Sequence, residues 1–294
     1  EIMEGYRCNN NCRFCYVSDM RNKTKMPGTK DLKRYILDSR KRGTTELAFL
    51  GGEPSLRKDI FELIRFARLL GFRRVKLTTN GRLLAYPEFT QKLVDAGITK
   101  VLFSIHGADA KTHDYLTQAR GSFKQLMKGI YNIKKYKGVV IETNSTITKT
   151  NYRQLPDMVK LFIRLGMLSS EFIYVFPKGN AWDNSDEIVP RFSDARPYME
   201  KSLDISKDKR TRILMGYVPY CILPNHIDGI ADQFDPPERE QVGPGTETLD
   251  VIKTRRELDR MHVDACRGCR CEKTCEGPWK DYVKIYGDDE FKRQ

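Results

Sequence analysis

The residues best suited to chemistry in this sequence are its eight cysteines, which stand in two groups. Three lie near the N-terminus and five near the C-terminus, with none between them. They are Cys8, Cys12 and Cys15, followed by Cys221, Cys266, Cys269, Cys271 and Cys275. Structural disulfides do not need such clustering, and the first six residues lack the basic and apolar regions of a secretory signal. We therefore expect both groups to bind metal.

The N-terminal group has the spacing CxxxCxxC and follows directly on a predicted strand. Three thiolates on one compact loop can hold three irons of a [4Fe-4S] cubane and leave the fourth iron without a protein ligand. Electron-carrier ferredoxins normally supply four cysteines, whereas the next cysteine after Cys15 is Cys221. The spacing therefore favours a cluster with an open coordination site. A zinc site is the alternative, although a nearby fourth ligand is missing.

This loop resembles the CxxxCxΦC signature of the radical S-adenosylmethionine (SAM) superfamily, with Phe14 as the aromatic residue. In that family the open iron is chelated by the amino and carboxylate groups of SAM. Reductive cleavage of SAM then gives a 5′-deoxyadenosyl radical, which abstracts hydrogen from the substrate. The resemblance implies that Cys8, Cys12 and Cys15 hold the catalytic cluster and that Phe14 lies at the cofactor.

A second motif, Gly51-Gly52-Glu53-Pro54, follows the second predicted strand and is similar to the GGEP motif of the same family. Glycines allow close approach of the backbone, and a carboxylate pairs with an ammonium group. The resemblance implies that Gly51, Gly52 and Glu53 meet the amino group of SAM.

Polar residues on three later strands complete the predicted cofactor site. Thr79 ends the third strand, Ser104 lies at the end of the fourth, and Asn144 lies on the fifth. By their position in the family we assign Ser104 and Asn144 to the ribose hydroxyls and the backbone after Tyr174 to the adenine edge. Each of the three side chains could instead be a cap at a strand end. We expect His106 to be a hydrogen-bonded structural residue and not a base.

The C-terminal group supplies four thiolates for a fully ligated second [4Fe-4S] cluster, from Cys221, Cys266, Cys269 and Cys275. Cys271 is left over and could replace Cys269. The arrangement resembles the twitch domain, a shortened relative of the SPASM domain that carries one auxiliary cluster. A zinc knuckle is the alternative, because paired cysteines separated by a long loop also bind zinc.

The order of predicted elements gives the scaffold for these residues. Short β-rich segments alternate with longer amphipathic ones up to about residue 176. The predicted strands are 1–6, 46–50, 74–79, 100–105, 139–146 and 171–176. The predicted helices are 29–41, 57–70, 87–96, 122–136 and 152–165, and four are followed by a terminating glycine, at Gly43, Gly71, Gly97 and Gly166.

This pattern predicts an α/β fold, a partial (β/α)6 TIM-like barrel over 1–206, followed by a small α+β iron–sulfur domain over 207–294 that resembles the twitch domain. Residues 180–206 are expected to form a connection and one helix. The C-terminal range contains Pro-rich and Gly-rich loops and too little apolar sequence for much core, so a metal would organise it.

Composition adds weaker expectations about partners. The 294 residues carry a net charge of +13, which favours an anionic partner, and the sequence has no apolar run long enough for a membrane span. We expect a cytoplasmic enzyme with two [4Fe-4S] clusters and SAM, reduced by an external donor such as flavodoxin or ferredoxin. Its substrate is expected to be a small or phosphorylated biosynthetic metabolite. The alternatives are a peptide-modifying maturase, an RNA-modifying enzyme and a non-enzymatic electron carrier. The sequence has no segment that combines basic and aromatic residues, as an RNA-binding site would.

Overall fold

The computed structural model describes residues 1–294 except 22, 236–238, 245 and 249. Its centre is a nine-stranded sheet in the order β7-β6-β5-β4-β3-β2-β1-β8-β9. All neighbouring strands are parallel except β8 and β9, which are antiparallel. The strands are β1 (Ile2–Met3), β2 (Glu46–Leu50), β3 (Arg74–Thr79), β4 (Lys100–Ser104), β5 (Val140–Ile147), β6 (Ser169–Tyr174), β7 (Arg212–Gly216), β8 (Gln241–Gly243) and β9 (Thr246–Thr248).

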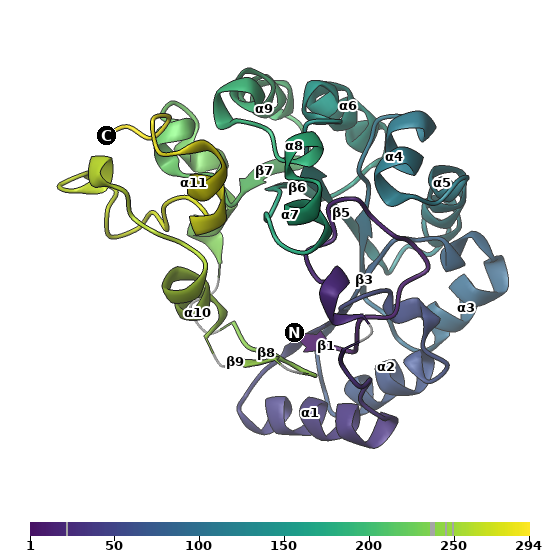
Figure 1. Ribbon diagram of the computed structural model, residues 1–294. Helices are drawn as coiled ribbons and strands as arrows, with labels where there is room; N and C mark the ends of the chain where they lie inside the picture. The colour runs from purple at the N-terminus through teal and green to yellow at the C-terminus, as the bar shows by residue number, and fades with distance from the viewer. Residues whose placement is uncertain (22, 236–238, 245, 249) are drawn as a thin grey trace.

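Helices form an outer layer around the curved sheet (Figure 1). The helices are α1 (Thr29–Lys41), α2 (Ile60–Leu69), α3 (Pro87–Asp95), α4 (Ala110–Thr117), α5 (Ser122–Ile133), α6 (Leu155–Leu165), α7 (Asn180–Asp183), α8 (Ser185–Ile188), α9 (Phe192–Ser206), α10 (Val251–Leu258) and α11 (Lys280–Tyr286). Gly166 ends α6 with φ +68° and its N–H bonded to Ile163 O, the left-handed cap predicted for it. Gly43, Gly71 and Gly97 also have positive φ, as predicted.

Buried and partly exposed side chains alternate along the strands, so one set faces the core and the other faces the inside of the partial barrel. On β5, Ile141, Thr143, Ser145 and Ile147 are buried, whereas the residues between them are partly exposed. Of the buried set, Ile141 and Ile147 belong to the hydrophobic core. The other set is polar and lies on the inner face, which leaves room for a site at the carboxyl ends of the strands.

The fold class predicted from the sequence is confirmed, an α/β partial barrel with a small C-terminal part, and the sheet is longer than expected. The six predicted strands form, although β1 is shorter and β6 begins two residues earlier, at Ser169. The range predicted to contain loops contributes β7, which pairs with β6, and β8, which pairs with β1. These strands are short and lie far apart in sequence, so periodicity alone did not reveal them. The predicted helix before residue 206 is confirmed as α9.

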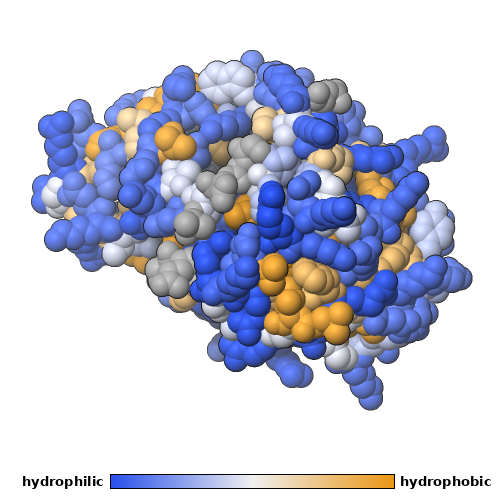
Figure 2. All heavy atoms as spheres, turned by 90° about the horizontal axis from the view of Figure 1, so that it is seen from below, coloured by the Kyte–Doolittle hydropathy of each residue, from blue (hydrophilic) through white to orange (hydrophobic). Residues whose placement is uncertain are grey.

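The two edges of the sheet do not meet, and the C-terminal segment lies between them. In Figure 1, α10 and α11 occupy the gap between β7 on one side and β8 and β9 on the other. Across the described residues, no helix has both the length and the apolar content to cross a membrane. Figure 2 shows a face that is mostly hydrophilic, with apolar side chains gathered in separate patches.

Candidate functional site

A cavity of about 460 Å³ lies at the carboxyl ends of the parallel strands. Its volume is within the range of small-molecule sites. Three parts of the chain line it, namely the N-terminal cysteine loop, the ends of β2 to β6 and the C-terminal segment. The structure brings every predicted barrel site residue to this cavity. They are Cys8, Cys12, Phe14, Cys15, Gly51, Gly52, Glu53, Thr79, Ser104 and Asn144.

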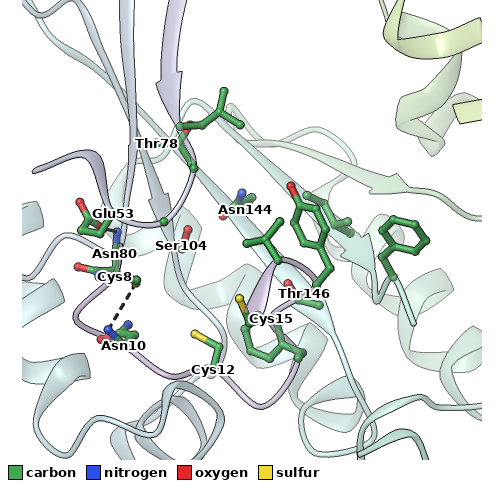
Figure 3. Close-up of a pocket in the computed structure, with 18 of the residues that line it drawn as sticks. Cys8, Asn10, Cys12, Cys15, Glu53, Thr78, Asn80, Ser104, Asn144 and Thr146 are labelled. Atoms are coloured by element: carbon green, nitrogen blue, oxygen red, sulfur yellow. Dashed lines mark hydrogen bonds between the residues drawn. The ribbon is translucent and has the colours of Figure 1, made fainter. Parts of the chain in front are cut away.

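The cysteine loop is held in place by backbone hydrogen bonds from distant segments. Asn11 N donates to Thr117 O at 3.0 Å, which ties the loop to the end of α4. Asn180, at the start of α7, donates from its backbone N to Cys15 O at 3.0 Å and from Nδ2 to Cys12 O at 2.8 Å. These bonds fix the directions of the cysteine side chains. Figure 3 shows the three cysteines on one loop at the edge of the cavity.

Burial and the charge of Arg21 act in opposite directions on the pKa values of Cys8 and Cys12. Burial raises the pKa of both Cys8 and Cys12. Arg21 Nη2 lies 3.4 Å from Cys15 Sγ, and Asn10 N donates to Cys8 Sγ at 3.4 Å. Buried thiols become thiolates when a metal ion or cation stabilises the charge, so this donor set fits iron ligation. Arg21 was missed from the sequence, where nothing but its nearness to Cys15 marks it.

Glu53 is the most densely hydrogen-bonded side chain of the cavity. Its Oε1 accepts from Ser55 N, Ser55 Oγ and Thr79 Oγ1 at 3.1, 2.5 and 2.6 Å, and its Oε2 accepts from Asn80 N at 2.6 Å. Burial raises the pKa of the carboxyl, and these hydrogen bonds oppose the shift. Glu53 therefore connects the end of β2 to the end of β3. Asn80 was not predicted, and it also lines the cavity.

The two glycines before Glu53 are required by the neighbouring backbone. A Cβ atom on Gly51 would lie 2.3 Å from Gly5 O, and one on Gly52 would lie 2.2 Å from Arg7 O. In return, Gly52 N donates to Gly5 O and Glu53 N donates to Arg7 O, each at 2.8 Å. The backbone pairing of β1 with β2 therefore continues beyond the two strands to the beginning of the cysteine loop. The glycines thus set the position of Glu53 relative to Cys8.

The three predicted strand-end residues differ in how much of their hydrogen-bonding capacity is free. Thr79 Oγ1 donates to Glu53 and accepts from Gly81 N, so it serves the loop after β3. Ser104 Oγ has no hydrogen bond to any residue that the structure describes. Asn144 Oδ1 is buried and has no hydrogen-bond partner. Because Ser104 and Asn144 are register partners on β4 and β5, they offer adjacent free polar groups to a ligand (Figure 3).

His106 is a neutral, hydrogen-bonded residue, as expected. Its Nδ1 accepts from Thr146 N at 3.1 Å, and its ring packs edge-on against Phe14 at 4.6 Å between centroids. Burial holds the pKa of the imidazole well below its usual range. The ring therefore stays uncharged and supports Phe14.

The C-terminal segment supplies a wall of the cavity that the sequence did not reveal. Tyr217, Arg255 and Trp279 line it from this side, and Phe176 lines it from the turn after β6. Phe176 and Trp279 stack with their ring centroids 4.2 Å apart. These residues are distant in sequence and belong to no recognisable motif, so only the fold brings them together.

The second group of cysteines surrounds a separate small cavity of about 20 Å³. All five thiols line it, with Cys221 coming from the segment after β7 and the others from the loop before α11. Gly277 N donates to Cys275 Sγ at 3.4 Å, and burial raises the pKa of Cys221 to about 11. Among the described residues, no three His, Cys, Asp or Glu side chains converge on a position for one metal ion. The thiolates of a cubane bind separate irons, so the set fits a cluster.

Comparison with known proteins places this geometry in a family. Residues 5–162 match the family model described as the Radical SAM superfamily. An AdoMet-dependent heme synthase of Methanosarcina barkeri is 30% identical over 72% of this chain and 60% of its own length. A probable GTP 3',8-cyclase of Saccharolobus islandicus is 26% identical over 75% of this chain and 69% of its own length. The chain spans about half to three fifths of the length of the heme synthases it matches.

Solved structures agree on the fold. The crystal structure of Streptococcus suis SuiB bound to S-adenosylmethionine superposes with a TM-score of 0.70 at 17% identity, over 100% of this chain and 75% of that one. HydG, a maturase of the [FeFe]-hydrogenase, gives a TM-score of 0.60 at 15% identity, over 98% of this chain and 68% of that one. Since the family model covers more than half of the sequence, from just before the cysteine loop into α6, this chain belongs to the radical SAM superfamily.

Proposed function

We propose that Cys8, Cys12 and Cys15 ligate the catalytic [4Fe-4S] cluster and that the barrel side of the cavity holds SAM. The observation that carries this proposal is that the three thiols share one cavity with Glu53 and Asn144. When bound, the reduced cluster and SAM supply a 5′-deoxyadenosyl radical that takes a hydrogen atom from the substrate. The protein contributes binding, orientation and the exclusion of water.

Each residue has a distinct part in holding SAM. The Glu53 carboxylate, fixed by its four hydrogen bonds, accepts from the amino group of the methionyl part. Asn144 Oδ1 accepts a hydrogen bond from a ribose hydroxyl, which gives this buried oxygen a partner. Ser104 lies beside it and binds the second hydroxyl. Thr79 acts indirectly by positioning Glu53.

The C-terminal region, residues 207–294, is proposed to hold one auxiliary [4Fe-4S] cluster on Cys221, Cys266, Cys275 and either Cys269 or Cys271. Support comes from the common cavity that these five thiols surround. A full set of protein thiolates leaves no iron open to the substrate, which favours electron transfer over direct ligation. The physiological reductant is proposed to be an acidic carrier of the flavodoxin or ferredoxin type, for which the net charge of +13 is complementary.

The proposed substrate is a small anionic biosynthetic metabolite. The named relatives include heme synthases, a Fe-coproporphyrin III synthase and probable GTP cyclases, whose names refer to small anionic compounds. The structure of SuiB with its precursor peptide shares the fold, so a peptide substrate is the second candidate. The closed C-terminal wall of Tyr217 and Trp279 favours the smaller ligand.

The decisive experiment is anaerobic reconstitution followed by iron and sulfide counting, with a dithionite-driven assay for 5′-deoxyadenosine. About eight irons per chain are expected, since two cubanes require them. Replacing Cys8, Cys12 and Cys15 together by alanine should remove about four irons and abolish 5′-deoxyadenosine formation.

The matched control replaces Cys221, Cys266 and Cys275 by alanine. It should also lose about four irons but still cleave SAM slowly, since the catalytic loop is untouched. Retained 5′-deoxyadenosine in the first triple variant would refute the assignment of the catalytic loop. An unchanged iron content in the control variant would refute the auxiliary cluster.

A further inference from the structure

The C-terminal wall of the cavity contains two buried donors without acceptors. Arg255 is 5% exposed and Trp279 is 1% exposed, and both line the cavity. Among the residues that the structure describes, Arg255 Nη1 and Trp279 Nε1 have no hydrogen-bond partner. Buried donors in native structures are almost always paired, so two orphans on one wall need an explanation.

The two donors lie around the same ring. Arg255 Cζ is 4.9 Å from the centroid of the Tyr217 ring, and the Trp279 ring centroid is 5.0 Å from it. Tyr217 follows β7 directly and has φ +62°, a left-handed conformation that is costly for a residue with a side chain. Its N–H donates to Asp232 Oδ1 at 2.8 Å, which helps to hold this conformation. This costly conformation places the Tyr217 ring next to both Arg255 and Trp279.

The other nitrogens of Arg255 are already occupied. Its Nε and Nη2 donate to Glu276 at 2.6 Å each, and Nη2 also donates to Asp235 at 2.9 Å. These bonds lock the guanidinium plane, so Nη1 has a fixed direction. A guanidinium and an indole N–H together donate to oxygen atoms, and neither can accept a hydrogen bond. The ligand of this wall therefore presents oxygen acceptors.

We propose that Tyr217, Arg255 and Trp279 form an oxyanion subsite that holds a carboxylate or phosphate group of the substrate. The inference rests on the proposed function, because it places SAM on the barrel side and the substrate on the C-terminal side of one cavity. Asn144 Oδ1, a free acceptor on the barrel side, belongs to SAM, whereas the two free donors of the C-terminal wall belong to the substrate. The division gives each ligand its own set of unpartnered groups.

The test uses the reconstituted, SAM-loaded protein and two simple probes, inorganic phosphate and acetate, at constant ionic strength in potassium chloride. The sequence has two tryptophans, and Trp182 is exposed, so Trp182→Phe leaves Trp279 as the sole reporter. Its emission should change saturably with at least one anion. Stronger binding of phosphate indicates a phosphorylated substrate, and stronger binding of acetate indicates a carboxylate.

Two variants in this background decide the assignment. Arg255→Lys removes Nη1 and should weaken anion binding by about tenfold, as loss of a charge-assisted hydrogen bond predicts. Arg256→Lys is the matched control, because Arg256 is half-exposed and does not line the cavity. No saturable change with either anion, or equal affinity in the two variants, would overturn the subsite.

A second pair guards against a folding defect in Arg255→Lys. Trp279→Phe removes the indole N–H and keeps the stacking on Phe176, and calorimetry should show weaker anion binding than in Trp182→Phe alone. Affinity equal to that of Trp182→Phe would again overturn the proposal. Iron content and 5′-deoxyadenosine are measured on every sample. Anion binding without 5′-deoxyadenosine would remove the proposed function and leave the subsite, and the reverse result would remove the subsite alone.

Discussion

The two cysteine groups of this protein differ in their surroundings more than in their chemistry. The N-terminal group lines a cavity of about 460 Å³, whereas the C-terminal group surrounds one of about 20 Å³. The first has three thiols on one loop and free polar groups nearby, and the second has five thiols with little space between them. Space beside a cluster allows a ligand to reach it, so the same kind of donor atom is arranged for reaction in one place and for enclosure in the other.

The supports of the two groups also differ. Hydrogen bonds hold the first loop, from Glu53 N to Arg7 O and from Asn180 to the carbonyl groups of Cys12 and Cys15. Buried ion pairs hold the second, where Glu276 accepts two bonds from Arg255 and lies 3.7 Å from Arg256 and Arg260. The barrel loop therefore depends on backbone geometry, and the C-terminal loop depends on charge.

The largest expected effect comes from removing that charge. Glu276→Gln removes the carboxylate that Arg255 and Arg260 share and leaves them only Asp235 and Asp232 as partners. This change should destabilise the C-terminal region by about 3 kcal/mol. Hydrogen exchange should then increase over α10 and residues 275–279, with β3 to β5 unchanged. Glu257→Gln is the control, because Glu257 is exposed on α10. Equal hydrogen exchange in the two variants would show that the charge of Glu276 does not hold the C-terminal cysteine loop.

The next test concerns which thiols belong to the second group. Cys271 packs against the hydrophobic core together with Cys221, Cys266 and Cys275, and among the described residues Cys269 does not. We therefore expect Cys271→Ala to lose about four irons per chain and Cys269→Ala to keep them. Iron and sulfide analysis of the two single variants measures the difference. Loss of iron in Cys269→Ala alone would assign the ligand to Cys269.

A smaller effect is expected at the first site. Glu53→Gln replaces the carboxylate that we assign to the amino group of SAM. The amide nitrogen of the glutamine would also face hydrogen-bond donors, which the Glu53 carboxylate now accepts. Affinity for SAM should fall by about tenfold. Anaerobic equilibrium dialysis measures it. Glu142→Gln on β5 is the matched control, because Glu142 pairs with Lys100 and lies outside the cavity lining. Equal SAM affinity in the two variants would contradict the assignment.

The smallest effect is a pH dependence in the barrel. Burial raises the pKa of Glu4 to about 8, with the Arg57 charge opposing it, and neither carboxyl oxygen has a hydrogen bond. The folded state then holds a proton that the unfolded chain releases, so the contribution of Glu4 to stability is present below its unfolded pKa and is lost as pH rises through the folded value.

Glu4→Gln should therefore stabilise the protein at about pH 9, where burying the charged carboxylate is costly, and have little effect at about pH 4, where Glu4 is neutral in both states. Thermal denaturation at the two pH values measures the difference. A stabilisation that is the same at both would show that Glu4 does not titrate in this range.

The sequence allowed the first region to be predicted much further than the second. The cysteine loop, GGEP and the strand ends are local patterns, and parallel strands place their carboxyl ends at one edge, so the residues of these motifs had to meet. The roles of Asn80 and Arg21 were missed because each depends on one long-range contact.

The C-terminal wall could not be predicted for a different reason. Tyr217 owes its place to a positive φ, and Trp279 owes its place to stacking on Phe176, neither of which leaves a pattern in sequence. β7 was missed because it lies beyond residue 176, where the regular alternation of strand and helix patterns in the sequence ends. The spacing of the cysteines was visible, whereas the charges that position them were not.

The contacts of the cysteine loop also impose an order on synthesis. Cys8, Cys12 and Cys15 are made before residues 117 and 180, yet their loop is bonded to Thr117 O and to Asn180. Gly179 packs so closely that a Cβ atom there would lie 2.7 Å from Cys15 O. The loop can reach its final shape only after residue 180 has emerged and folded back, a long-range closure that is slow compared with local helix formation. Loading of the cluster that we propose for this loop is therefore expected only after residue 180 has folded back, although the proposed ligands are made before it.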